Sequence, residues 1–262
     1  MRKIHVIPQK QKRNTLIALL IVAILFTIAS IQTEYQPLSF FMNMENFWEF
    51  LLVDLFPPQL ADPPTIVEGI VQTISMAIAA SLLSCVFSLI LAFLGSRTTA
   101  PFQPLCKIIR FLASLQRNIP SMIWTFILIM AFGIGSVVGA LALFITTCGF
   151  LIRSFIETID EVGAESLEAL QSVGASRLAI ITQVIIPASL PGFLSWLLYS
   201  LEVNIRSSTL VGAVGGGGIG LIMMGYIKQF RYHSAMGVIL LIAAVVIIVD
   251  LLTNYLRKKV LA

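Results

Sequence analysis

The sequence predicts an all-α, polytopic membrane protein with about six transmembrane helices. Hydrophobic residues make up 58% of the 262 positions and charged residues only 11%, which is less charge than a soluble domain of this length carries. The charges are clustered, so that long uncharged runs separate them, and roughly 20 apolar residues are enough for a helix to cross a bilayer. Lys and Arg also gather in particular connecting segments, which is typical of polytopic membrane proteins.

The expected spans are residues 15–33, 66–95, 119–132, 137–153, 188–210 and 235–254. The third and fourth share one uncharged run, 119–152, which as a single helix would be about 50 Å long against a hydrocarbon core of about 30 Å. Gly133, Gly135 and Gly139 supply a turn within this run, so we expect two helices there. Residues 15–262 are expected to form one membrane domain, in which the first span precedes a core of five helices.

The distribution of basic residues predicts that both termini face the cytoplasm, because Lys and Arg are retained on that side. Five of the first 13 residues are basic, and Arg257, Lys258 and Lys259 follow the last span. Residues 34–64 contain five acidic residues and no Lys or Arg, so this segment is expected in the periplasm, whereas 1–14 and 154–187 are expected in the cytoplasm. The net charge of +4 follows from this topology and does not indicate a nucleic-acid partner.

Within the periplasmic segment, residues 42–55 mix apolar and acidic side chains. One interpretation is an amphipathic helix that lies on the outer membrane surface, with Trp48 as an interfacial anchor. The other is an ordinary connector between the first two spans.

The loop 154–187 carries the most specific pattern in the chain. It reads as a helix that ends near Gly174, followed by a second helix that is stopped by Pro187. Ala164, Leu167 and Leu170 fall on one face of the first helix, so this helix offers an apolar stripe to something other than lipid.

This spacing resembles the cytoplasmic loop motif of ABC importer permeases. Leu170 and Ile186 depart from the residues usual in that motif, and both changes conserve volume and polarity. The resemblance implies that the loop docks on an ATPase subunit and transmits its movement to the membrane helices. The residues that match the motif's positions are Glu168, Ala169, Gly174, Ile186 and Pro187.

Three further segments make most of the chain similar to the permeases of phosphonate importers: Phe56-Pro57-Pro58, 117–120 and 201–220. The resemblance implies the type I ABC importer permease fold. It also implies ATP-driven uptake by alternating access of phosphonates, or of phosphite or a phosphate ester, across the bacterial inner membrane. The implied partners are a second copy of the chain, two copies of a cytoplasmic ABC ATPase subunit that binds ATP and Mg, and a periplasmic substrate-binding protein.

The chain itself is not expected to be an enzyme or to bind a cofactor or metal. It lacks the Gly-x-x-x-x-Gly-Lys-Ser/Thr loop that binds nucleotide phosphates, so ATP hydrolysis must come from another polypeptide. Its two histidines are isolated and its three cysteines show no metal-ligand spacing. The alternatives are an ABC permease for a different small solute and an ion-coupled secondary transporter, although no half repeat of the second class is evident.

Glu202 and Arg206 are the strongest candidates for a charged centre of the translocation pathway. They are four residues apart with the acid first, which is the favourable order for an ion pair on a helix. Asn204 falls on a different face, and Ser207 and Ser208 add hydroxyl groups. The alternative is a structural ion pair that locks helices together.

The run Gly215, Gly216, Gly217 and Gly218 is the second candidate. Each glycine lowers helix stability by roughly 1 kcal/mol relative to alanine. Irregular backbone at membrane depth is tolerated only where it is buried in protein or lines a cavity. The run is therefore either a gate or close-approach turn of the pathway, or a plain loop between the last two spans.

Overall fold

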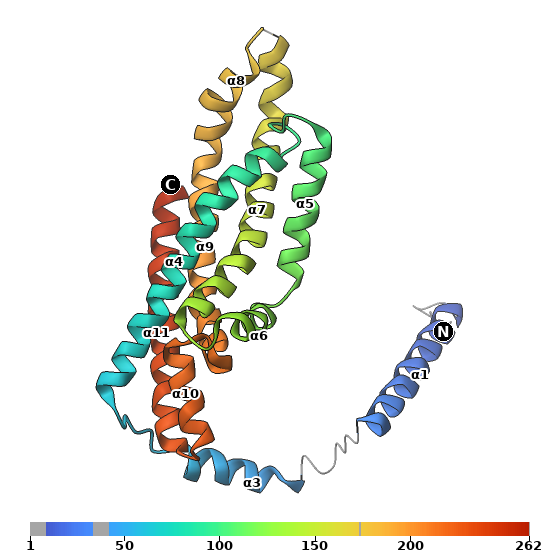
Figure 1. Cartoon of the computed structure of the whole chain (residues 1–262). Helices are drawn as coiled ribbons and strands as arrows, with labels where there is room; N and C mark the ends of the chain where they lie inside the picture. The colour runs from blue at the N-terminus through green and yellow to red at the C-terminus, as the bar shows by residue number, and fades with distance from the viewer. Residues whose placement is uncertain (1–8, 34–41, 173, 262) are drawn as a thin grey trace. The chain divides into compact units, whose positions relative to one another are not determined.

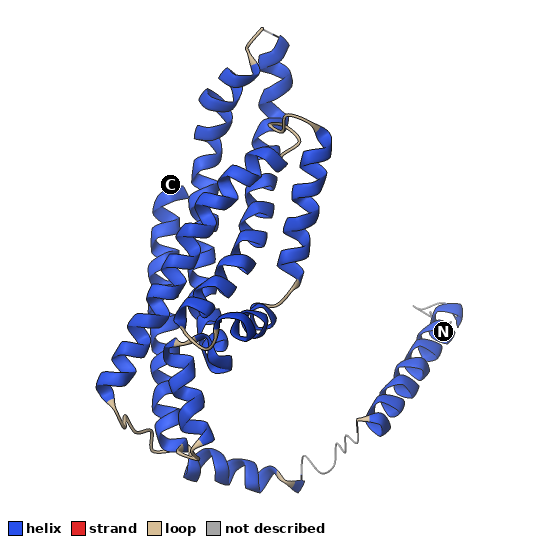
Figure 2. Cartoon of the chain, in the orientation of Figure 1, coloured by secondary structure: helices blue, strands red, loops and turns tan. Residues whose placement is uncertain are grey.

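The computed structural model describes residues 9–33, 42–172 and 174–261, which fall into two compact units, Met1–Asp54 and Leu55–Ala262. All regular secondary structure in these residues is helical (Figure 2). The first unit holds α1 (Gln9–Gln32), α3 (Met44–Glu49) and the π turn η1 (Phe50–Asp54). The expected N-terminal span is therefore α1, and the helix expected at 42–55 is α3 with η1.

From Leu16 to Ile28 the side chains of α1 are apolar on nearly every face of the helix and exposed, as lipid contact requires. In α3, the rings of Phe47 and Trp48 pack edge to face with their centroids 5.5 Å apart, and both remain exposed. The first unit therefore has no buried core among its described residues.

The second unit is a bundle in which α4, α5, α7, α9 and α11 run alongside one another (Figure 1). Short helices connect them: α6 between α5 and α7, α8 before α9, and α10 before α11. The elements are α4 (Pro63–Gly95), α5 (Gln103–Asn118), α6 (Ser121–Phe132), α7 (Ser136–Ser172), α8 (Arg177–Ile180), η2 (Ile181–Ile185), α9 (Ile186–Val211), η3 (Gly212–Gly216), α10 (Gly218–Lys228) and α11 (Tyr232–Leu261).

The sequence of α4 explains why it begins at residue 63 and packs closely on α7. Asp62 is its N-cap, with a carboxylate oxygen 2.6 Å from the Thr65 hydroxyl, and prolines occupy the first turn, where their missing N–H groups are not needed. Small residues line its buried face and let the two backbones approach. The Ser84 hydroxyl then donates to the Phe144 carbonyl of α7 at 3.0 Å.

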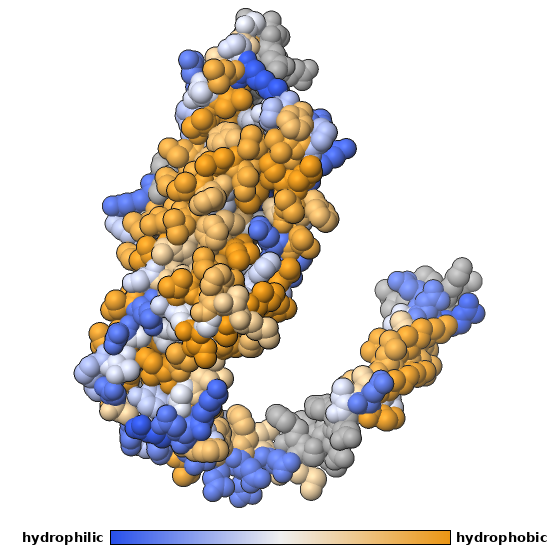
Figure 3. Space-filling view, viewed as in Figure 1, coloured by the Kyte–Doolittle hydropathy of each residue, from blue (hydrophilic) through white to orange (hydrophobic). Residues whose placement is uncertain are grey.

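Among the residues that the structure describes, five helical segments are long and apolar enough to cross a membrane: Gln11–Gln32, Pro63–Gly95, Ser136–Gly163, Arg177–Gly216 and Tyr232–Lys259. The polytopic all-α fold expected from the sequence is therefore confirmed. Figure 3 shows hydrophobic side chains over the middle of the second unit and hydrophilic ones toward its two ends, as a membrane-spanning bundle requires.

The structure differs from the expected spans between residues 97 and 132. The segment expected as a span, 119–132, holds only the 12-residue α6, which at 1.5 Å per residue is about 18 Å long and too short to cross alone. The preceding segment, expected as a loop, forms α5 and buries Cys106, Ile109 and Ala113. Lys107 and Arg110 lower the hydropathy of α5 and so conceal its apolar face. Helix α5, and not the segment 119–132, therefore runs alongside α4 and α7 (Figure 1).

The second difference concerns the expected end of the fourth span at residue 153 and the expected end of the cytoplasmic loop at residue 187. Helix α7 does not end near residue 153 but continues to Ser172, so the first half of the expected loop is an extension of a span. Pro187 does not stop a helix, because it lies in the first turn of α9, where a missing N–H is tolerated. The π turn η2 joins α8 to α9, so helical backbone continues across this position.

Candidate functional site

A cleft of about 260 Å³, lined by apolar and polar side chains, opens between α7, α9 and the junction of α5 with α6. Its α7 residues, 143–150, occupy the middle of the candidate span Ser136–Gly163, so the cleft lies at mid-membrane depth. The lining residues are Arg117, Ile119, Pro120 and Ser121 from the junction, Leu143, Thr146, Thr147 and Phe150 from α7, and Tyr199, Ser200, Val203, Asn204 and Ser207 from α9.

The junction owes its shape to Pro120. A residue that precedes proline avoids the helical region, and Ile119 is extended at φ −93° and ψ 118°, so α5 ends there. Helix α6 then begins at Ser121 in a different direction (Figure 1). Gly149 lets α7 pack closely against this junction. A Cβ at that position would lie only 2.8 Å from the backbone nitrogen of Arg117. Arg117 and Ser121 consequently line the same cleft.

Asn204 fixes the inner wall of the cleft. Its side chain is buried, its Oδ1 accepts a hydrogen bond from the Thr147 hydroxyl at 2.8 Å, and its Nδ2 donates to the Ser81 hydroxyl oxygen at 2.8 Å. The amide therefore joins α4, α7 and α9 at one point. Asn204 lies on a different face of α9 from Glu202 and Arg206, as predicted.

The predicted ion pair is present, with the Arg206 guanidinium 3.0 Å from a carboxylate oxygen of Glu202. The second oxygen of Glu202 lies 3.8 Å from Arg257 of α11, and the Glu202 side chain is only 11% exposed, against 57% for Arg206. Neither residue of the predicted pair lines the cleft. Of the two predicted serines, Ser207 lines the cleft, whereas Ser208 is buried and donates to the Ile205 carbonyl at 2.7 Å.

The four glycines form a tight buried turn that comprises the end of η3 and the start of α10. Gly215, Gly217 and Gly218 have positive φ angles of 112°, 79° and 71°, which side chains with a Cβ rarely adopt. Gly216 has an ordinary φ but touches α7, and a Cβ on Gly139 would overlap its carbonyl oxygen.

The other side of this turn is fixed to α4. The Gly218 N–H donates to Oε1 of Gln72 at 2.7 Å, and the Ile219 N–H donates to the Thr73 hydroxyl oxygen at 2.8 Å. These bonds satisfy the first N–H groups of α10, which no helical carbonyl reaches. The structure therefore has a close-approach turn here, and a role of this turn in the pathway or as a gate stays a prediction.

The predicted glycine break is confirmed. Helix α7 runs through Glu168 and Ala169, whose side chains lie outside the described part of the structure, and Gly174 follows its end with a φ of 84°. The Ala175 N–H donates to the Leu170 carbonyl at 3.1 Å, which is the bond that closes a helix at a left-handed glycine. The chain then reverses into α8, which Ser176 caps by accepting from the Ala179 N–H at 3.3 Å.

The end of α7 and helix α8 form a projecting arm, residues 161–185, which extends beyond the turn between α4 and α5 (Figure 1). Ile186 and Pro187 begin α9 directly after this arm. Ile180 and Ile185 are buried in the main apolar core together with Phe155 of α7. The base of the arm is therefore packed against the apolar core of the bundle.

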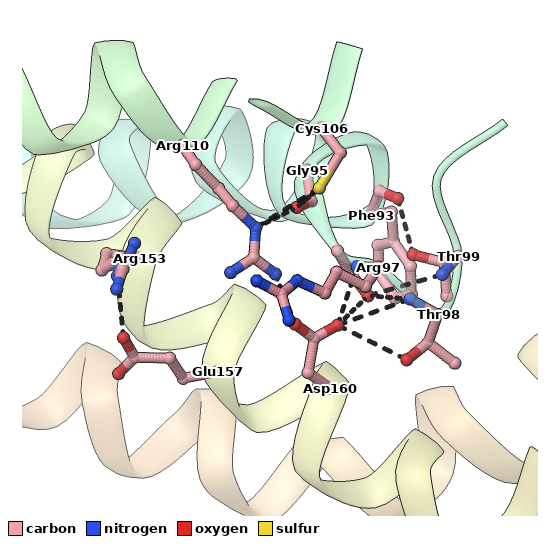
Figure 4. Close-up of polar contacts among 11 residues, drawn as sticks. Phe93, Gly95, Arg97, Thr98, Thr99, Cys106, Arg110, Arg153, Glu157 and Asp160 are labelled. Carbon is pink, nitrogen blue, oxygen red and sulfur yellow. Dashed lines mark hydrogen bonds and ion pairs between the residues drawn. The ribbon is translucent and has the colours of Figure 1, made fainter. Parts of the chain in front are cut away.

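A polar hub around Asp160 of α7 holds the base of this arm. The carboxylate accepts hydrogen bonds from the Ser96 hydroxyl at 2.5 Å and the Arg97 N–H at 2.9 Å, and it forms an ion pair with Arg110 of α5 (Figure 4). One acid thus ties together α4, α5 and α7. Sequence reasoning missed this hub, because the partners of Asp160 lie 50 to 64 residues away and no local spacing marks them.

Arg177 connects helix α8 to the same turn. Its guanidinium donates to the Thr98 carbonyl at 3.2 Å and to the Ala100 carbonyl at 2.7 Å. Arg177 therefore joins the arm to the turn between α4 and α5, and Asp160 joins its base to α5.

Comparison with known proteins identifies relatives over most of the chain. Residues 86–262 match the family described as the binding-protein-dependent transport system inner membrane component. The chain is 32% identical over 205 residues to the phosphite transport system permease protein PtxC of Stutzerimonas stutzeri, which covers 78% of this chain and 74% of the relative. It is 29% identical over 228 residues to the phosphate-import permease protein PhnE of Mycolicibacterium smegmatis, which covers 87% of this chain and 43% of that relative.

The fold also resembles solved structures. A chain of the methionine ABC transporter MetNI in an inward-facing conformation matches with a TM-score of 0.64 and 22% identity, over 77% of this chain and 99% of that chain. The type I ABC importer permease fold expected from the sequence is therefore confirmed.

Proposed function

Because the chain belongs to the family of inner membrane components of binding-protein-dependent transport systems, we propose that it is the membrane-spanning subunit of an ATP-driven importer for phosphonates or a related small phosphorus oxyanion. The observation that carries this proposal is the similarity, over 78% and 87% of the chain, to permeases named for phosphite and for phosphate import. Phosphite, phosphonates and phosphate esters share a small anionic phosphorus group, so one pathway chemistry suits all of them.

The proposed partners follow from this role. Transport across a two-fold pathway requires a second copy of the chain, and energy requires two copies of a cytoplasmic ABC ATPase subunit that bind ATP and Mg. A periplasmic binding protein delivers the substrate. The projecting arm, with Glu168, Ala169 and Gly174, is the surface proposed to dock on the ATPase, and both chain termini are proposed to lie on the same cytoplasmic side.

The structure supports a coupling mechanism in which the ATPase moves the arm. The arm is fixed to the bundle by Arg177 and by the hub at Asp160, so a displacement of its tip must shift α5, α7 and the start of α9. These three helices also carry the residues that line the cleft. Closure of the ATPase dimer would thus change the width of the cleft, which is the movement that alternating access needs.

The first test is purification of the tagged chain from its native membrane, followed by uptake in proteoliposomes. We expect an ABC ATPase subunit to co-purify, and ATP-dependent uptake of radiolabelled phosphite or methylphosphonate when the binding protein is supplied. Uptake that requires an ion gradient and no ATPase would contradict the proposal and favour a secondary transporter. ATP-dependent uptake of other solutes, with no uptake of any phosphorus oxyanion, would retain the ABC permease and reject the substrate class.

A further inference from the structure

The cleft contains an arginine that has no counter-charge. Arg110, Arg153, Arg206 and Arg257 are each within 4.0 Å of a carboxylate. In the part of the chain that the structure describes, Arg117 has neither an ion pair nor a hydrogen bond. A charged side chain at mid-membrane depth costs at least about 2.5–3.5 kcal/mol to insert, so one that is retained there needs a watery cavity and a function.

The rest of the cleft is suited to an anion. It contains no Asp or Glu, and its polar lining consists of Arg117, hydroxyl groups and one amide. Among the described residues, the hydroxyls of Ser121, Tyr199 and Ser207 have no hydrogen-bond partner, so they are available as donors. A cation would meet only the positive charge of Arg117, and an apolar ligand would leave these donors unsatisfied.

The volume of the cleft also fits a small ligand that does not stay. The share of one water molecule in the liquid is about 30 Å³, so a cleft of about 260 Å³ holds a small oxyanion together with several waters. Incomplete desolvation keeps binding weak, and a site on a transport pathway must release its ligand as readily as it takes it up.

We propose that this cleft is a transient binding site for a tetrahedral phosphorus oxyanion, in which Arg117 supplies the charge and Ser121, Tyr199 and Ser207 supply hydroxyl donors. The inference rests on the proposed function and adds the place within the permease where the anion is bound. It replaces Arg206, the arginine that the sequence indicated, because Arg206 is already paired and lies outside the cleft.

The first test compares Arg117→Gln with Arg153→Gln, the same change at an arginine of α7 outside the cleft, in the complete transporter reconstituted in proteoliposomes. At saturating binding protein, Arg117→Gln should lower phosphite uptake by about tenfold or more, as expected for loss of a hydrogen bond to a charged group. Arg117→Lys, which keeps the charge, should recover part of the rate. The amount of assembled complex should match that of Arg153→Gln. Equal uptake by Arg117→Gln and Arg153→Gln would overturn the site.

A second measurement keeps the native arginine and therefore does not depend on folding of the Arg117 variant. In Ser207→Cys, millimolar inorganic phosphite should slow modification of the new thiol by a neutral thiol reagent in the transporter complex without binding protein. The native protein measures the background labelling of its own cysteines, of which Cys106 and Cys148 are buried and Cys85 is partly exposed. Protection should be lost in the combined variant with Arg117→Gln. If the native transporter takes up phosphite but Ser207→Cys shows no protection, the binding site in the cleft is rejected and the proposed function stands. If the native transporter takes up no phosphorus oxyanion, the proposed substrate class and the binding site are both rejected.

Discussion

The two polar clusters of the second unit differ in how completely their charges are satisfied. In the hub, the carboxylate of Asp160 is surrounded by Arg110, the Ser96 hydroxyl and backbone N–H groups. In the cleft, Arg117 faces hydroxyls and no carboxylate. A satisfied cluster holds helices together, whereas an unsatisfied one is open to a ligand. Substitutions in the hub should therefore destabilise the fold, and substitutions in the cleft should impair transport in a protein that still assembles.

The largest effect on stability is expected for Asp160→Asn. The change removes the counter-charge of Arg110 and leaves a partly buried cation unpaired, which costs about 3 kcal/mol or more when one partner of such a pair is lost. Thermal unfolding in detergent should occur at a clearly lower temperature, and the level of assembled complex should fall. Glu157→Gln is the control, because Glu157 lies on the same helix with a side chain that is 59% exposed. If Asp160→Asn and Glu157→Gln unfolded at the same temperature, the hub would not have the structural role assigned to it.

The next effect is expected at the turn that closes the projecting arm. Gly174→Val places a β-branched residue at a φ of 84°, where a left-handed conformation costs an L-residue about 1–2 kcal/mol. The direction of α8 should change, so uptake and the stimulation of ATP hydrolysis by loaded binding protein should be lost while membrane insertion is kept.

Gly174→Asn is the matched control for this prediction. Asparagine tolerates the left-handed region better than other residues with a Cβ, and the space around Gly174 is open. Transport should therefore be largely retained in the Asn variant. Full transport by the Val variant would argue against a role of the arm in coupling.

A smaller effect on stability is expected for Asn204→Ala in the wall of the cleft. The substitution removes the bonds to Thr147 and Ser81, and interhelical bonds within membranes are worth about 0.6 kcal/mol on average and up to about 1.7 kcal/mol. A modest decrease in unfolding temperature should accompany a change in uptake rate. Asn254→Ala, on α11, serves as the control. A decrease as large as that of Asp160→Asn would show that the wall of the cleft is as structural as the hub.

The smallest effect is expected for Arg206→Gln. Arg206 is 57% exposed, and Glu202 keeps Arg257 as a partner after the change, so neither assembly nor uptake should change by more than about twofold. Uptake measured beside that of Arg117→Gln tests which of the two arginines serves the pathway. A severe loss in Arg206→Gln with intact assembly would restore the position that the sequence first indicated.

Hydropathy and local spacing predicted the features of this fold that depend on neighbouring residues. The long apolar helices, the glycine break at Gly174 and the pair of Glu202 with Arg206 all follow from spacings of a few residues. Helix α5 was not predicted because Lys107 and Arg110 lower its hydropathy, although Arg110 lies on the buried face beside Cys106 and pairs there with Asp160. Charged side chains that are paired inside the protein lower the hydropathy of a helix, so a segment of low hydropathy is not necessarily a loop.

The candidate site was predicted only in part, for the same reason. Asn204 and Ser207 were placed on the pathway from the polarity of α9, and both line the cleft. Arg117 entered the sequence analysis only within the segment 117–120 that resembles phosphonate permeases, because nothing in that segment shows that α7 and α9 meet there. The role of Asp160 likewise depends on residues that are distant in the sequence and come close only in the folded chain.

The contact between Arg177 and the turn after α4 has a consequence for exchange of segments between related permeases. Both acceptors are main-chain carbonyls, those of Thr98 and Ala100, so the side chains at these positions contribute nothing to the bond. A turn of different composition and equal length offers the same two oxygens. The Arg177 contact thus depends on the course of the backbone in this turn, and we expect it to be kept in an exchanged segment wherever that course is kept.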